Sequence, residues 1–316
     1  MEWALVSLGL VILLLAGDAL VRGAVNLSLR IGIPALIVSL TIVAFGTSAP
    51  ELLISLQAVM NNAPGIAMGN VVGSNTANIL LVLGIPAILA TLHTSHCNTR
   101  RTYNFMIAAT LLFIALAFRG LFDFWAGIVL LGALAFVLGD AFHQARAHRR
   151  ALAGIAETEE DVEGADPDMP WWRIAVFLLL GLAGLPLGAD LMVDNAEIIA
   201  RHYGVSDTVI GLTLVALGTS LPELATTVMA ALRRQADVAL GNVIGSNMFN
   251  LLAIIGITAV VHPIPVDPKF LVFDLWVMLG ASVLIVPFVF LKRDISRLWG
   301  VVLTLLYLLY IIVVLT

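Results

Sequence analysis

The sequence LTIVAFGTSAPEL at residues 40–52 recurs as LTLVALGTSLPEL at residues 212–224. A second stretch, GNVVGSNTAN at residues 69–78, recurs as GNVIGSNMFN at residues 241–250. Both pairs are offset by 172 residues, the difference between positions 40 and 212. Most matching positions hold Gly, Ser, Thr, Pro, Asn or Glu, which two unrelated apolar segments would not share by chance. An internal repeat of this kind indicates two copies of one structural unit.

The composition around these motifs is that of a membrane protein. The 316 residues are 60% hydrophobic and only 12% charged, whereas soluble domains carry about 25% charged and about 45–50% apolar residues. The formal net charge of -5 offers no basic surface for nucleic acid. The single cysteine, Cys97, excludes an internal disulfide and a cysteine-based metal cluster. We therefore expect an all-α integral membrane protein.

Apolar stretches define the expected membrane-spanning helices. A spanning helix needs about 20 mostly apolar residues. Glycine and proline interrupt the second, third, seventh and eighth stretches, so we expect these four helices to be broken. The sequence predicts ten spans, at residues 3–21, 33–60, 65–91, 103–118, 122–140, 171–194, 205–232, 236–262, 270–290 and 296–315.

The ten spans divide into two halves of five, at residues 1–140 and 171–316, joined by a linker at residues 141–170. Because five is odd, the second half enters the membrane from the opposite side, and the halves are expected to be inverted copies. Such repeats with broken helices are typical of secondary transporters with a site at the membrane midplane.

The basic residues predict the orientation. Thirteen of the sixteen Lys and Arg residues fall on the linker's side of the membrane. Since cytoplasmic loops are enriched in Lys and Arg, we expect a cytoplasmic linker, both termini outside, and a location in the plasma (inner) membrane.

Each GTS-x-PE motif places a glycine and a proline near the middle of its span. Pro50 removes a backbone donor and Gly46 tolerates the distortion, so the carbonyls of residues 44–47 are expected to lose their helical partners. Free carbonyls at membrane depth are tolerated only where they line a cavity or contact an ion. Glu51 follows the proline directly. The second copy holds the equivalent residues in the same order: Ala216, Thr219, Ser220, Pro222 and Glu223.

The second motif adds polar side chains spaced by four residues. Asn70, Ser74 and Asn78 should share one face of a helix, and the second copy repeats them as Asn242, Ser246 and Asn250. Carboxylate, amide, hydroxyl and carbonyl oxygens are the ligands that hard cations prefer, and no thiolate or imidazole accompanies them. The motifs therefore favour Ca²⁺ and Na⁺ over zinc or copper.

The two acids determine the expected type of transport. A charged carboxylate at mid-membrane costs at least about 2.5–3.5 kcal/mol, and Glu51 and Glu223 together carry two negative charges when ionised. One Ca²⁺, several Na⁺ or two protons would neutralise them. A site that is costly when empty must reload before it reorients, so we expect exchange without a unidirectional leak.

The four motifs, in this order and register, resemble the alpha-repeats of the cation/calcium exchanger superfamily, whose best-known branch exchanges Na⁺ for Ca²⁺. The resemblance covers essentially the whole chain. It implies alternating access by movement of spans one and six against the other eight. Where Asn250 stands, family branches that also move K⁺ carry Asp, so a neutral Asn weakens the case for K⁺.

The resemblance also implies roles for individual residues. Glu51 and Glu223 would chelate Ca²⁺, and Asn78 and Asn250 would complete the centre of the site. The implied backbone ligands are the carbonyls of Thr47 and Thr219 for Ca²⁺ and those of Ala44 and Ala216 for Na⁺. The implied Na⁺ hydroxyls belong to Thr47, Ser48, Ser74, Thr219, Ser220 and Ser246.

The residues also bear on other functions. An intramembrane hydrolase using Ser48 or Ser220 would need a nearby base, and all six histidines fall in loops or at span ends, so we expect no enzyme. A cation channel is one alternative. Exchange of Ca²⁺ for H⁺ is the closer one, although six hydroxyls around the acids favour Na⁺. The expected partners are the lipid bilayer and the transported ions. The sequence indicates no cofactor, no nucleic-acid partner and no protein partner.

Overall fold

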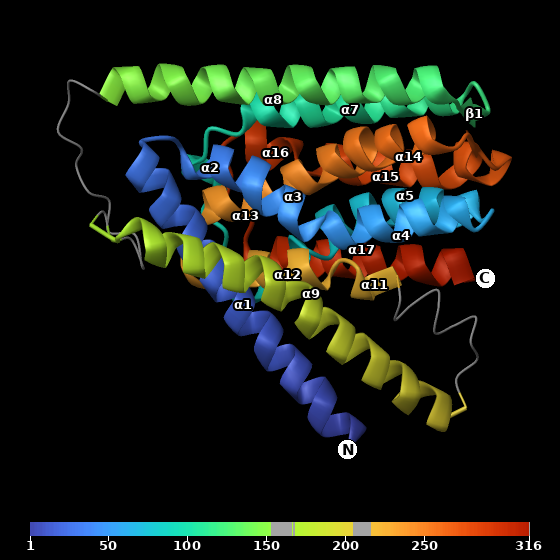
Figure 1. The fold of residues 1–316 in the computed structure, drawn as a ribbon, viewed down its shortest axis with the longest axis horizontal. Helices are drawn as coiled ribbons and strands as arrows, with labels where there is room; N and C mark the ends of the chain where they lie inside the picture. The colour runs from blue at the N-terminus through green and yellow to red at the C-terminus, as the bar shows by residue number, and fades with distance from the viewer. Residues whose placement is uncertain (153–165, 167, 205–215, 316) are drawn as a thin grey trace.

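The computed structural model describes the backbone of residues 1–152, 166, 168–204 and 216–315. Most of the expected linker and the first part of the expected span at 205–232 lie outside these residues. The described chain is almost entirely helical (Figure 1). Its strands are β1 (Leu121–Phe122) and β2 (Ile264–Pro265), which pair antiparallel.

The first part of the chain contains the helices α1 (Glu2–Ile31), α2 (Ala35–Val38), η1 (Ser39–Val43), α3 (Ala44–Thr47), α4 (Ala49–Met60), α5 (Pro64–Leu80), α6 (Gly84–Leu89), η2 (Thr94–His96), α7 (Arg100–Ala117) and α8 (Phe124–Leu152).

The second part contains α9 (Trp171–His202), α11 (Ala216–Gly218), α12 (Leu221–Leu232), α13 (Ala236–Met248), η4 (Phe249–Ile254), α14 (Ile255–Val261), η5 (Phe270–Asp274), α15 (Leu275–Leu284), α16 (Val286–Phe290) and α17 (Arg297–Leu315).

Within the described ranges, seven helices are long and apolar enough to cross a membrane. An eighth is added if Ala35–Thr47 and Ala49–Met60, bent by 42°, form one span. The expected span at 103–118 forms α7, which is not one of these seven helices. In the described residues, the expected span at 205–232 consists of α11 and α12. The fold is an all-helical membrane architecture, and the number ten stays a prediction.

The expected helix breaks occur where proline supplies them. The third span breaks between α5 and α6, and Pro86 lacks the N–H that would bond to the carbonyl of Val82. The expected break in the eighth span is wrong, because α13, η4 and α14 follow one another without a gap. The position that corresponds to Pro86 is Thr258, which keeps its N–H. The helix instead widens into a π-helical turn at η4.

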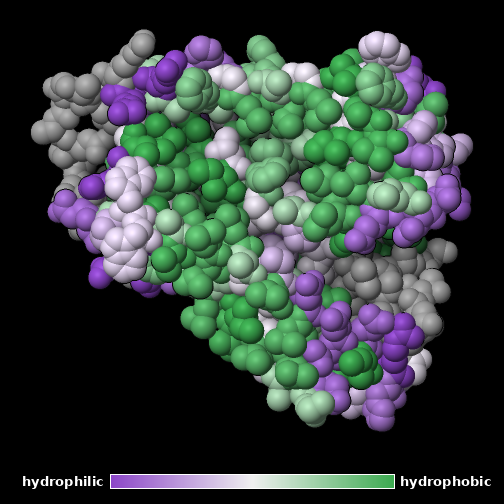
Figure 2. Space-filling view, in the orientation of Figure 1, coloured by the Kyte–Doolittle hydropathy of each residue, from purple (hydrophilic) through white to green (hydrophobic). Residues whose placement is uncertain are grey.

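The two helices that carry the GSN motifs form the core. The apolar window of Pro64–Leu89 is 83% buried and that of Ala236–Val261 is 89% buried, against 17–39% for the other five long helices. Hydrophobic side chains form a broad band across the middle of the visible face, with hydrophilic side chains toward the helix ends (Figure 2). The molecule thus has a polar motif-bearing centre and an outer surface suited to lipid.

Helices α1 and α9 cross the rest of the bundle side by side (Figure 1). They approach closely because glycines meet, and a Cβ on Gly188 would lie 2.9 Å from the backbone N of Leu13. Asp18 of α1 forms ion pairs with Arg22, at 2.9 Å, and with Arg233 at the end of α12. This cluster joins α1 to α12.

Helix α8 continues to Leu152, past the expected beginning of the linker at residue 141. The stretch HQARAHRR at residues 143–150 is therefore helical in this structure.

Candidate functional site

The two GTS-x-PE motifs adopt the same backbone turn. Helix α3 ends at Thr47 and α4 begins at Ala49, with Ser48 between them at φ -84° and ψ 3°. In the second copy, Ser220 precedes α12 at φ -88° and ψ 1°. Each proline lies at the start of the new helix, and each glutamate lies in its first turn. A carboxylate there is stabilised by the positive end of the helix dipole.

In the first GTS-x-PE motif, the backbone carbonyl of Ala44 is hydrogen-bonded, contrary to the expectation. The carbonyl of Ala44 accepts the backbone N–H of Ser48 at 3.0 Å and the hydroxyl of Thr47 at 3.3 Å, so it has partners. The expectation that it would be free is wrong, because the helix continues to Ser48 before it bends. Pro50 has no N–H to donate to Gly46, so the loss begins two residues later.

Glu223 is held by hydroxyls from both sequence copies. Its Oε1 accepts a hydrogen bond from Ser48 at 3.2 Å and one from Ser246 at 3.4 Å. Glu223 is 1% exposed. Because Ser48 lies on the turn that carries Glu51, this bond brings the two acidic turns together.

Two asparagines brace the glutamate-bearing helices. Asn70 donates to the carbonyl of Glu51 at 3.2 Å and to the hydroxyl of Ser55 at 3.1 Å. The counterpart bonds of Asn242 to Glu223 and Thr227 measure 3.3 and 3.1 Å. Asn242 Oδ1 also lies 3.3 Å from Thr47 Oγ1, which makes it an alternative acceptor to the carbonyl of Ala44 for that hydroxyl.

Four further amides meet where α5 contacts α13 and η4. Asn78 donates to Oδ1 of Asn247 at 3.0 Å, and Asn250 donates to Oδ1 of Asn75 at 3.2 Å. All four side chains are at most 1% exposed. The sequence reasoning missed Asn75 and Asn247, as well as Ser55 and Thr227. The signal that could have found the two asparagines is their identity in both copies of the GSN motif.

Among the residues that the structure describes, several buried oxygen atoms of the site have no hydrogen-bond partner. They are one carboxylate oxygen of each glutamate and the amide oxygens of two asparagines, together with a serine hydroxyl: Glu51 Oε2, Glu223 Oε2, Asn78 Oδ1, Asn250 Oδ1 and Ser220 Oγ. Leaving such a buried acceptor unpaired costs about 1–3 kcal/mol, more when it is charged. Oxygen atoms of this kind are what a hard cation coordinates.

The remaining candidate residues lie on the same elements as this network or next to them in the chain. Ser74 is 4% exposed on α5, and Thr219 is half-buried on the turn before α12. The backbone of Ala216 begins α11. In the described part of the chain, no group of three or more His, Cys, Asp or Glu side chains could hold a metal.

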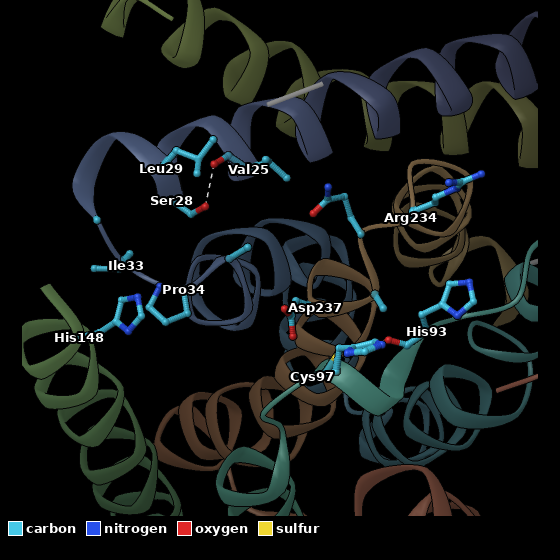
Figure 3. A pocket seen from close by; sticks show the side chains of 15 residues that line it. Val25, Ser28, Leu29, Ile33, Pro34, His93, Cys97, His148, Arg234 and Asp237 are labelled. Carbon is cyan, nitrogen blue, oxygen red and sulfur yellow. Dashed lines mark hydrogen bonds between the residues drawn. The ribbon is translucent and has the colours of Figure 1, made fainter. Parts of the chain in front are cut away.

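A separate cavity of about 430 Å³ lies where α1 ends and α13 begins (Figure 3). Ser28, Cys97, His148 and Asp237 are among its lining residues, and the described lining includes none of the candidate ligands. The oxygen cluster is thus distinct from this cavity.

Comparison with known proteins supports a transporter. The family described as "Sodium/calcium exchanger protein" matches residues 1–139 and 173–316. The "Sodium/calcium exchanger MaX1" of Methanosarcina acetivorans is 32% identical over 99% of this chain and 98% of its own length. "Inner membrane protein YrbG" of Escherichia coli is 33% identical, over 89% of this chain and 86% of its own.

A solved structure agrees with these relatives. The sodium-calcium exchanger NCX_Mj, soaked with Na⁺ and Sr²⁺, matches with a TM-score of 0.82 and 31% identity over 98% of this chain and 97% of its own. The family consists of transporters, so the expected absence of enzyme activity is confirmed. The chain is a multi-pass membrane protein and cation antiporter, and it belongs to the sodium/calcium exchanger family.

Proposed function

We propose that this antiporter exchanges Ca²⁺ for Na⁺ by alternating access and extrudes Ca²⁺ across the plasma membrane. The observation that carries the proposal is the set of five unpartnered oxygens. Four of them belong to residues at equivalent positions of the two sequence copies, Glu51 with Glu223 and Asn78 with Asn250. Two carboxylates supply the charge that Ca²⁺ neutralises, and amide oxygens extend the coordination without adding charge.

Within this site, Glu51 and Glu223 chelate Ca²⁺ with the carbonyls of Thr47 and Thr219, and Asn78 and Asn250 complete the centre. Na⁺ takes hydroxyl and carbonyl oxygens around the same acids. The hydroxyls of Ser48 and Ser246 already point at Glu223, which supports their participation. The proposed Na⁺ ligands are Ala44, Thr47, Ser48, Ser74, Ala216, Thr219, Ser220 and Ser246.

The architecture that we propose is ten spans in two inverted halves, residues 1–140 and 171–316, around a linker at 141–170. The paired bonds support it, because Asn70 and Asn242 make the same two contacts in their respective copies. We place both termini outside and the linker in the cytoplasm. A Lys269→Cys variant in a Cys97→Ser background should then react with an impermeant thiol reagent from outside intact cells, and Arg149→Cys should not. The reverse pattern would invert the topology.

Electrostatics supports exchange over free diffusion through a channel. Two buried carboxylates without a cation make reorientation costly, so each passage needs a bound ion. The absence of a resident cofactor and of a protein partner is likewise part of the proposal.

The experiment is uptake of radioactive Ca²⁺ into proteoliposomes of the full chain. We expect uptake with an outward Na⁺ gradient at equal pH, and none with a pH gradient without Na⁺. Uptake driven by pH and indifferent to Na⁺ would replace Na⁺ with H⁺ as the coupling ion. Uptake that needs no counter-cation would indicate a channel.

A further inference from the structure

Four buried asparagines cross-link the two core helices. Asn75 and Asn78 lie on α5, Asn247 lies on α13, and Asn250 lies on η4. Their bonds are reciprocal, because Asn78 donates to Asn247 while Asn250 donates to Asn75. Asn75 and Asn247 are not among the proposed ligands. Each of them nevertheless accepts the hydrogen bond of one proposed ligand amide.

The orientation of the Asn247 amide is fixed by groups that only accept. Its Nδ2 donates to the backbone carbonyl of Asn75 at 3.4 Å and faces the thioether sulfur of Met106 at 3.8 Å. A carbonyl and a thioether have no proton to give, so the amide nitrogen must face them. Oδ1 of Asn247 therefore faces Asn78.

Groups that only accept also orient the amide of Asn75, in the other copy. Nδ2 of Asn75 donates to the backbone carbonyl of Asn247 at 3.4 Å and faces the sulfur of Met278 at 3.7 Å. Oδ1 of Asn75 therefore faces Asn250. The two methionines are themselves separated by 172 residues, the offset of the sequence repeat.

This arrangement determines which end of each ligand amide stays free. Since Asn78 must present its NH₂ to Oδ1 of Asn247, its own oxygen points away, and that oxygen has no hydrogen-bond partner. Oδ1 of Asn250 is free for the same reason. A reversed amide would direct two N–H dipoles toward a cation and repel it.

We propose that Asn75 and Asn247 are positioning residues that hold the oxygens of Asn250 and Asn78, respectively, toward the transported cation. The inference rests on the proposed function, because it assumes that Asn78 and Asn250 bind the cation. It also explains why asparagine stands at both positions, since aspartate offers no N–H for the carbonyl and alanine offers no acceptor.

The test is a double-variant cycle read by equilibrium Ca²⁺ binding to the purified full chain. Asn247→Ala should raise the Kd for Ca²⁺ by about 10–100-fold, the usual effect of removing a group that orients a metal ligand. In an Asn78→Asp background, Asn247→Ala should change the Kd for Ca²⁺ little, because both terminal atoms of an aspartate are oxygens. In an Asn250→Asp background the full loss should remain, because Asn75 orients residue 250.

The other copy provides an independent cycle and a safeguard against misfolding. Asn75→Ala should be relieved by Asn250→Asp and not by Asn78→Asp. Equal losses of affinity in both aspartate backgrounds, or no loss in either alanine variant, would overturn the positioning role. If Asn78→Ala and Asn250→Ala bound Ca²⁺ like the parent chain, the proposed site itself would fail instead, so the two failures are distinguishable.

Discussion

The hydroxyl of Ser48 donates a hydrogen bond to Oε1 of Glu223 across 3.2 Å, although the two residues are 175 positions apart in the chain. Ser48 begins the S-x-x-E pattern of a capping box, yet it makes no capping bond to its own helix. The hydroxyl binds the acid of the opposite copy instead. One turn of each repeat thus contributes to a shared buried centre.

The two motif serines should differ when they are removed. Ser48→Ala deletes a hydrogen bond to the buried carboxyl group of Glu223, whereas Ser220 Oγ has no partner to lose. Bonds to charged groups contribute about 1.5–3 kcal/mol. We expect Ser48→Ala to lower the free energy of unfolding by this amount in ion-free detergent and Ser220→Ala to leave it near the parent value. Equal losses in thermal unfolding would contradict the asymmetry.

Close packing of α1 on α9 should be intolerant of an added methyl group. In Gly188→Ala, the new Cβ would lie 2.9 Å from the backbone N of Leu13 and 3.0 Å from the carbonyl of Gly9. Because the clashing atoms belong to the backbone, relieving the clash requires a shift of the helix. We therefore expect a loss of about 1–3 kcal/mol in unfolding free energy.

Gly132 on α8 provides the matched control, because nothing lies within 4 Å of the position that an added methyl group would take there. Gly132→Ala should be neutral or stabilising by up to about 1 kcal/mol, since alanine favours a helix. Thermal unfolding of both variants checks the pair, and equal behaviour would argue against tight packing at Gly188.

The single cysteine, Cys97, lines the cavity at the end of α1. Burial raises the pKa of the Cys97 thiol, and the negative charge of Asp237 raises it further. Because the folded state holds this proton more tightly, its stability contribution is present below about pH 8.5, the ordinary thiol pKa, and declines as pH rises above it. We expect slow alkylation of the folded protein at pH 8 and fast alkylation after unfolding. Rapid reaction in the folded state would show an accessible thiolate.

The sequence was sufficient for the features that side-chain chemistry and spacing determine. It predicted a helical membrane protein, the glutamates and asparagines whose oxygens are left unpartnered, and the helix bend near Pro50. It could not predict which end of an amide faces the site, because the carbonyls that orient Asn75 and Asn247 come from the other half of the chain. Nor could it distinguish Ser48 from Ser220, whose local sequences are nearly identical while their tertiary contacts differ.

Two expectations failed for local reasons. The carbonyl of Ala44 keeps its helical partner because the chain bends only at Ser48. The eighth span stays continuous because glycine alone does not remove a backbone donor, and no proline lies between Ala236 and Val261. The first expectation placed the effect of Pro50 two residues too early, and the second expected glycine to break a helix without proline.

The central claim is that one buried site needs an acid from each sequence copy. Its most direct test is equilibrium Ca²⁺ binding to the purified chain, compared with the variants Glu51→Gln and Glu223→Gln and with Asp18→Asn as a carboxylate control outside the site. We predict that either glutamine variant abolishes measurable binding and Na⁺-driven exchange, while Asp18→Asn retains both. Retention of Ca²⁺ binding at the parent affinity by either glutamine variant would contradict a shared site.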